Sequence, residues 1–211
     1  MNLPNKLSMT RIIMIPFVML FMLPISAYGH EPDKWNDFID SKGMTIAAIL
    51  FIIASLTDLF DGKIARKYNL ITNLGKFLDS LADKMLVIAV LIAFVSLGRV
   101  SPWLLAIIVL REFMVTGIRL IASKEGVVMA AKMIGKIKTT TQMIAITYLM
   151  FEPLLHKISG EGYDGYALMV AGDTNAILVI GNILVYICVI MTVISGADYM
   201  IKNINYLRES D

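Results

Sequence analysis

Four aspartates interrupt an otherwise apolar stretch in the first half of the chain. Asp58 and Asp61 lie three residues apart, and Asp79 and Asp83 lie four residues apart. On a helix these separations place both members of a pair on one face. Two such faces turned toward each other would form a cage of four carboxylates, which are the ligands that hard divalent cations prefer. The spacing therefore predicts a site for two divalent ions about 4 Å apart, an arrangement that can clamp a transferring phosphate.

One arginine and two glycines accompany these carboxylates. The planar guanidinium of Arg66 suits the binding of a pyrophosphate, and Gly62 and Gly75 allow a bulky ligand to approach the backbone closely. A helix that begins near Gly75 would also offer free N–H groups to a phosphate. The alternative interpretation is a set of polar helix ends neutralised by neighbouring lysines, but four aspartates at these spacings favour the metal site.

The composition indicates an all-helical membrane protein with one integral membrane domain over residues 1–211. The chain is 57% hydrophobic and 17% charged, with a mean hydropathy of +0.73, which argues against an ordinary soluble domain. Six apolar segments predict six transmembrane helices. The second and third segments are shorter than the roughly 30 Å hydrocarbon core, so their helices must continue into the aspartate segment. The helices are expected near 8–28, 43–67, 75–98, 101–122, 132–155 and 175–200, with external loops at 29–43 and 152–175.

The basic residues predict the orientation of the chain. All but four of the 19 Lys and Arg residues fall on the side of the membrane that carries the aspartates, and cytoplasmic segments show such an excess. We therefore expect a multi-pass protein with both termini and the aspartate site facing the cytoplasm. We expect membrane lipid, and no nucleic acid, as its partner. The four exceptions are Lys34, Lys42, Arg99 and Lys157.

The residues around the aspartates resemble a known family signature. Between Asp58 and Asp83 the chain reads D-x2-D-G-x2-A-R-x8-G-x3-D-x3-D, which is similar to the signature of the CDP-alcohol phosphotransferase family at every fixed position. The resemblance implies six transmembrane helices and a reaction in which an acceptor hydroxyl displaces CMP from a CDP-linked lipid or alcohol. It also implies two Mg²⁺ or Mn²⁺ ions and a homodimer.

The same resemblance implies a role for each matching residue. Asp58, Asp61, Asp79 and Asp83 would be the metal ligands. Asp83 would also be the catalytic base that takes the proton of the acceptor hydroxyl. The residues expected to contact the CDP group are Asn5, Gly62, Ala65, Arg66 and Gly75.

A second group of charged residues points to the acceptor. Arg111 lies in the middle of an apolar span, where a cation costs roughly 2.5–3.5 kcal/mol to insert, and Arg119, Lys136 and Lys138 follow it. This concentration of positive charge suits an anionic acceptor, although some of these residues could serve only the topology. From residue 2 to about 142 the sequence is similar to bacterial inner-membrane members of the family that use sn-glycerol 3-phosphate. The resemblance implies that these four residues bind its phosphate.

Other interpretations stay open at this point. The same chemistry could use another acceptor, such as inositol phosphate, serine or phosphatidylglycerol. A divalent-cation transporter could also place carboxylates within the membrane, but it would be expected to have paired broken helices in two matching halves, and the sequence shows none.

Overall fold

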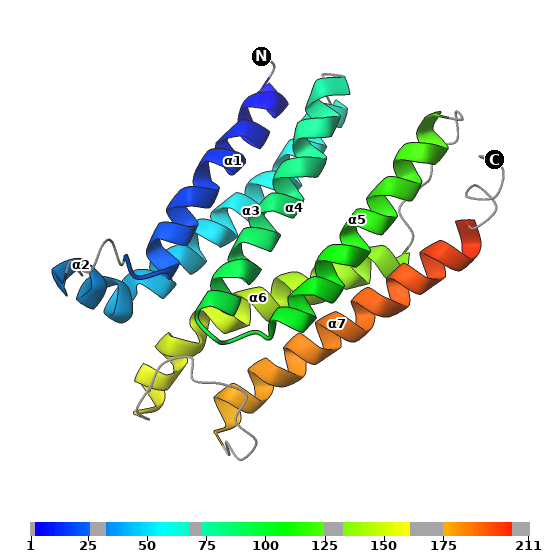
Figure 1. The fold of residues 1–211 in the computed structure, drawn as a ribbon. Helices are drawn as coiled ribbons and strands as arrows, with labels where there is room; N and C mark the ends of the chain where they lie inside the picture. Colours follow the sequence, from blue (N-terminus) through cyan, green and yellow to red (C-terminus); the bar gives the residue numbers. More distant parts are fainter. Residues whose placement is uncertain (1–2, 26–32, 68–72, 125–132, 161–174, 204–211) are drawn as a thin grey trace. The chain divides into compact units, whose positions relative to one another are not determined.

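The computed structural model is helical throughout the part of the chain that it describes (Figure 1). This part leaves out residues 1–2, 26–32, 68–72, 125–132, 161–174 and 204–211, and it gives only the backbone at 3–7, 33, 58–67, 73–80, 120–121, 123–124 and 203. The expectation of an all-α protein is confirmed for the described residues. The helices are α1 (Leu3–Met22), α2 (Asp33–Phe38), the π-helix η1 (Ile39–Gly43), α3 (Met44–Lys67), α4 (Asn73–Ser96), α5 (Pro102–Lys124), α6 (Met133–Ser159) and α7 (Ala176–Asn203).

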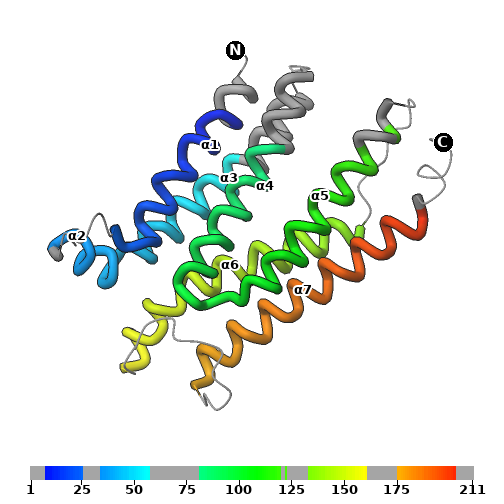
Figure 2. Tube along the Cα trace, viewed as in Figure 1, coloured from blue at the N-terminus to red at the C-terminus, as the bar shows by residue number. Residues whose placement is uncertain are grey.

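The first of two compact units consists of Met1–Leu97 and Met150–Ala167. In this unit α1 packs against both α3 and α4 (Figure 2). The contact is close because α3 presents small residues to its neighbours, and Ala47 and Ala54 are completely buried. The last part of α6 also belongs to this unit.

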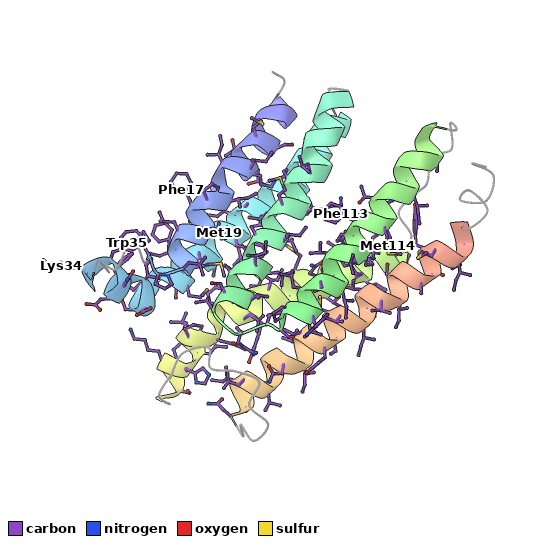
Figure 3. The ribbon with its side chains drawn as sticks, viewed as in Figure 1. Phe17, Met19, Lys34, Trp35, Phe113 and Met114 are labelled. Atoms are coloured by element: carbon purple, nitrogen blue, oxygen red, sulfur yellow. The ribbon has the colours of Figure 1, made fainter. Side chains whose placement is uncertain are left out.

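The second unit consists of Gly98–Leu149 and Leu168–Asp211, and in it α5 packs against α7. The first part of α6 is joined to the start of α7 by a hydrogen bond from the Tyr148 hydroxyl to the carbonyl oxygen of Ile177 (3.0 Å). The outer face of α5 is strongly apolar, and Phe113 and Met114 project from it (Figure 3). Phe113 is 66% exposed, which suits contact with lipid rather than water.

Two stretches are long and apolar enough to cross a membrane by themselves. They are Lys34–Thr57 and Ala176–Lys202, and Ser8–Met22 is a shorter apolar helix, all within the described residues. Together with the exposed apolar side chains of α5, these helices favour a membrane protein. The finer expectation of six spans goes beyond this finding.

The segment expected to be the first external loop, residues 29–43, contains the helices α2 and η1 over residues 33–43. The indole of Trp35 packs against the rings of Phe21 and Phe38, at centroid distances of 6.0 and 5.9 Å. The amide side chain of Asn36 donates to the carbonyl oxygen of Ile25 and accepts from its N–H. These contacts fold the segment back onto the end of α1.

Two helix ends also differ from the expectation. The first helix ends at Met22 instead of near 28, since the following Pro24 disfavours a helical conformation at the residue before it. Helix α6 continues through Pro153 to Ser159, past the expected end at 155. It stops where Gly160 adopts a φ of +73°, the left-handed conformation that commonly ends a helix.

We predict that Gly43→Ala destabilises the protein. A Cβ atom at Gly43 would lie 2.4 Å from the carbonyl oxygen of Phe21, so η1 would have to move away from α1, at a cost of about 1–3 kcal/mol. Thermal unfolding in detergent measures the effect. Gly117→Ala in α5 is the matched control, because a Cβ there meets nothing within 4 Å and should be neutral or stabilising by up to about 1 kcal/mol. Equal melting temperatures for the two variants would contradict the prediction.

Candidate functional site

The buried stripe of α3 leads toward the first pair of aspartates. Phe51 and Ala54 are completely buried and lie three residues apart. Asp58 follows Ala54 by four residues and Asp61 follows it by seven, within the same continuous helix. These intervals continue the 3–4 spacing of one helix face. The helical register therefore puts both residues in line with the stripe that faces the core of the first unit.

The buried stripe of α4 leads to the second pair. Ala82, Leu86 and Val90 are buried at intervals of four residues. Asp79 precedes Ala82 by three residues in the same helix, and the side chain of Asp83, next to Ala82, is half-buried. The second pair is thus in register with the packed face of its helix.

The two pairs also lie at matching depths along their helices. Asp61 stands six residues before the end of α3, and Asp79 stands six residues after the start of α4. At 1.5 Å per residue, each is about 9 Å from its helix end. Asp58 and Asp83 are nine and ten residues from the same ends, or about 13–15 Å. Only residues 68–72 separate α3 from α4. Measured from these two helix ends, Asp61 and Asp79 form one level, and Asp58 and Asp83 form a second level farther along the helices.

The donor set of these four positions suits a hard divalent cation, because carboxylate oxygens are the ligands that Mg²⁺ and Mn²⁺ prefer. No three His, Cys, Asp or Glu side chains gather at metal-binding distance among the residues that the structure describes. The side chains of Asp58, Asp61 and Asp79 lie outside that part, as do those of Asn5, Ala65 and Arg66 and the surroundings of Gly62 and Gly75. The metal cage and the CDP contacts stay predictions.

A buried arginine on α1 is an addition to the sequence-based site. Arg11 is 1% exposed and Ser8 is 2% exposed, and Arg11 lies in the part of the chain that carries the family resemblance. Figure 1 shows the start of α1 at the same end of the first unit as the start of α4. The buried guanidinium of Arg11 adds positive charge near that end.

In the second unit, Glu112 joins two of the predicted acceptor-binding residues. Its carboxylate Oε1 accepts hydrogen bonds from the Arg111 guanidinium (3.2 Å) and from the Lys138 ammonium. Lys138 also donates to the side-chain oxygen of Gln142 (2.6 Å) and is only 4% exposed. Arg111 and Lys138 therefore come together around a shared carboxylate, as a partly buried cluster of two cations and one anion.

The cluster extends to α7 through Ser195, which the sequence reasoning missed. Arg111 donates to the Ser195 hydroxyl at 2.5 Å. The neighbouring Gly196 lets the arginine side chain lie against the α7 backbone, since a Cβ there would be 2.8 Å from Arg111 Cγ. A polar, small Ser-Gly pair inside a long apolar helix was the available signal.

The other two predicted acceptor-binding residues, Arg119 and Lys136, are exposed. The Arg119 guanidinium carbon lies 5.6 Å from the centre of the Tyr199 ring, and Tyr199 is buried together with Val115 and Ile118. This cation–π contact restricts Arg119 without neutralising it. Tyr199 is a second residue that the sequence reasoning missed.

The threonines that follow Lys136 are occupied by the backbone. The hydroxyls of Thr139, Thr140 and Thr141 donate to the carbonyl oxygens of Gly135, Lys136 and Lys138. The lysine ammonium groups, and not the hydroxyls, are therefore the donors that this segment of α6 can offer to an anion.

Comparison with known proteins identifies the family of this all-helical chain. The profile of the family described as CDP-alcohol phosphatidyltransferase matches residues 1–194. The chain belongs to this family and is therefore a phosphatidyltransferase enzyme.

Three similar curated proteins carry the name CDP-diacylglycerol–glycerol-3-phosphate 3-phosphatidyltransferase. The protein of Bacillus subtilis (strain 168) is 41% identical over 100% of this chain and 99% of its own length. That of Rickettsia felis is 33% identical over 94% of this chain and 93% of its own, and that of Escherichia coli (strain K12) is 36% identical over 72% and 78%. The resemblance predicted from the sequence is confirmed.

We predict that removing the carboxylate of Glu112 costs more stability than removing the whole ion pair. Glu112→Gln leaves the buried Lys138 ammonium without its counter-charge, and breaking such a buried pair costs about 3–5 kcal/mol. In the double variant Glu112→Gln/Lys138→Met no unpaired ammonium remains, so part of the stability returns. Thermal unfolding of the two variants and of Lys138→Met completes a double-mutant cycle. Additive losses in the cycle would show that the two side chains do not interact.

Proposed function

We propose that this protein transfers the phosphatidyl group of CDP-diacylglycerol to sn-glycerol 3-phosphate, giving phosphatidylglycerophosphate and CMP. The observation that carries the proposal is the helical register between the four signature aspartates and the buried residues of α3 and α4. Relatives that are named for this reaction and match nearly the whole chain support it. The family membership supports the use of the CDP-linked donor.

The residues of the first unit would carry out the bond exchange. A hydroxyl oxygen of glycerol 3-phosphate attacks the phosphorus that carries the diacylglycerol, and the bond from this phosphorus to the bridging oxygen breaks, so that CMP leaves. The half-buried carboxylate of Asp83 accepts the proton of the attacking hydroxyl. Two Mg²⁺ or Mn²⁺ ions held by Asp58, Asp61, Asp79 and Asp83 would supply charge stabilisation to the phosphate oxygens.

The CDP group would be held by residues near the same end of the first unit. Arg66 offers its planar fork to the pyrophosphate, and Gly62 and Gly75 leave room at the backbone. The remaining contacts proposed are Asn5 and Ala65.

The second unit would bind the acceptor phosphate. Arg119 and Lys136 present exposed charges, and Arg111 and Lys138 contribute the cluster around Glu112, which keeps an excess of one positive charge. Such an excess favours a phosphomonoester dianion over a neutral acceptor such as serine.

The placement in the membrane follows from the charge distribution. We propose one integral membrane domain of six spans in the bacterial inner membrane, with both termini and the active site on the cytoplasmic side. The family resemblance supports a homodimer. A divalent-cation transporter is the competing function, and it would move ions without releasing CMP.

The purified protein, supplied with labelled CDP-diacylglycerol and Mg²⁺, should release CMP with glycerol 3-phosphate and not with inositol phosphate, serine or phosphatidylglycerol. Asp83→Asn should lower turnover by at least about 100-fold, the usual size of a general-base contribution, while binding of the CDP-lipid persists. Product analysis and a CDP-lipid binding assay measure the two effects. Turnover with a different acceptor would remove the acceptor assignment, and full activity of Asp83→Asn would remove the base.

Arg119→Ala and Lys136→Ala should each raise the apparent KM for glycerol 3-phosphate by about tenfold or more, the size expected for one charge-assisted hydrogen bond. The KM for CDP-diacylglycerol should change little. Steady-state kinetics in mixed micelles measures both constants. Lys202→Ala is the matched control, since Lys202 is an exposed lysine of the same unit that pairs with Asp198. Equal changes in both KM values would contradict the acceptor-binding role.

A further inference from the structure

A pocket lies in the first unit, far along α3 from the aspartates. Its volume is about 610 Å³, and it is bounded by η1, the start of α3 and the last part of α6. Asp61 follows Met44, a lining residue, by 17 residues on α3, which is about 26 Å along the helix axis. The pocket is therefore separate from the site of phosphatidyl transfer.

The lining of the pocket is divided between charged and apolar groups. Lys42 of η1 and Lys157 of α6 contribute two ammonium groups, and Asp40 contributes one carboxylate. None of these three groups forms an ion pair with a residue that the structure describes. The apolar part of the wall consists of Met44, Ile46, Pro153 and Leu154.

The π-helical geometry of η1 presents the polar side of the pocket. Ile39 and Gly43 are buried, and Gly43 lies directly against the carbonyl oxygen of Phe21, so that the intervening Asp40, Ser41 and Lys42 are exposed. π-Helical turns are rare and occur frequently at functional sites. The close contact at Gly43 holds this turn to α1 and thereby sets the position of the three polar residues.

The neighbouring α2 has the character of a segment at the membrane interface. Trp35 and Lys34 lie side by side on it (Figure 3), and tryptophans concentrate at the level of lipid headgroups. A pocket that adjoins this helix is thus at the depth where a headgroup meets its acyl chains.

We propose that this pocket binds one membrane phospholipid, as a site distinct from that of the substrates. The phosphodiester lies between Lys42 and Lys157, a donor group of the headgroup bonds to Asp40, and the glycerol and first acyl carbons lie on the apolar wall. The net charge of the three polar groups, one positive, complements one phosphodiester. The volume is within the 300–1,000 Å³ range of small-molecule sites, and the apolar wall favours a lipid over a free phosphate.

The lipid can be located by protection of lysines from acylation. The full-length protein is delipidated in detergent and mixed with dioctanoyl phosphatidylglycerol, dioctanoylglycerol or inorganic phosphate. Lysine labelling is then read by peptide mass spectrometry. Phosphatidylglycerol should slow the labelling of Lys42 and Lys157 at least about fivefold, and it should leave Lys34, an exposed lysine that does not line the pocket, unchanged. The other two compounds should protect none of the three.

Paired variants test the same site by affinity. Lys42→Gln/Lys157→Gln should bind dioctanoyl phosphatidylglycerol about tenfold or more weakly than the Lys34→Gln control, since the variant loses both cations that attract the phosphodiester. Both variants should keep wild-type CMP release, because neither touches the transfer site, and this also reports correct folding. Protection by inorganic phosphate alone, protection by dioctanoylglycerol, or equal affinity of the two variants would overturn the proposal. The test of the pocket is lipid affinity, and CMP release serves only as a check of folding. A failure of the lipid site can therefore be distinguished from a failure of the proposed reaction.

Discussion

Charged groups within a hydrocarbon layer are stable only if the protein itself replaces the water that they have lost. The two units bear on this constraint in different ways. In the first unit, the helical register aligns the aspartate positions of α3 and α4 with residues such as Ala54 and Leu86 that are buried. In the second unit, Glu112 lies between two cations and neutralises half of their charge. The carboxylate of Glu112 is thus held between cations of its own unit.

The division of charge between the units matches the demands of the proposed reaction. A phosphatidyl transfer joins an apolar, membrane-bound donor to a small, highly charged acceptor, and it needs anionic ligands for metals as well as cations for the acceptor. The chain supplies the carboxylates from α3 and α4 and the cations from α5 and α6. Tyr199 adds restraint to Arg119 without removing its charge, which suits a residue that must meet a dianion.

The sequence predicts those features of the fold and the site that depend on residues close together in the chain. The extension of the second and third apolar segments into the aspartate segment is visible from their length alone, and α3 and α4 have this extent. The signature around Asp58 likewise lies within one stretch of chain. By contrast, Ser195, which accepts a hydrogen bond from Arg111, is 84 residues away in the chain, and no spacing rule connects the two residues. The fold of α2 onto α1 depends on Trp35 and Asn36 meeting particular atoms, and composition alone made that segment read as a loop.

The ion pairs of Glu112 have a consequence for the synthesis of the protein at the ribosome. Arg111 and Glu112 are adjacent on α5 and bond to each other, so this segment emerges with its own charges already matched. These two charges are therefore paired before α6 has been synthesised. Lys138 is synthesised 26 residues later, when the carboxylate of Glu112 is already present. The order of residues along the chain is thus also a workable order of insertion.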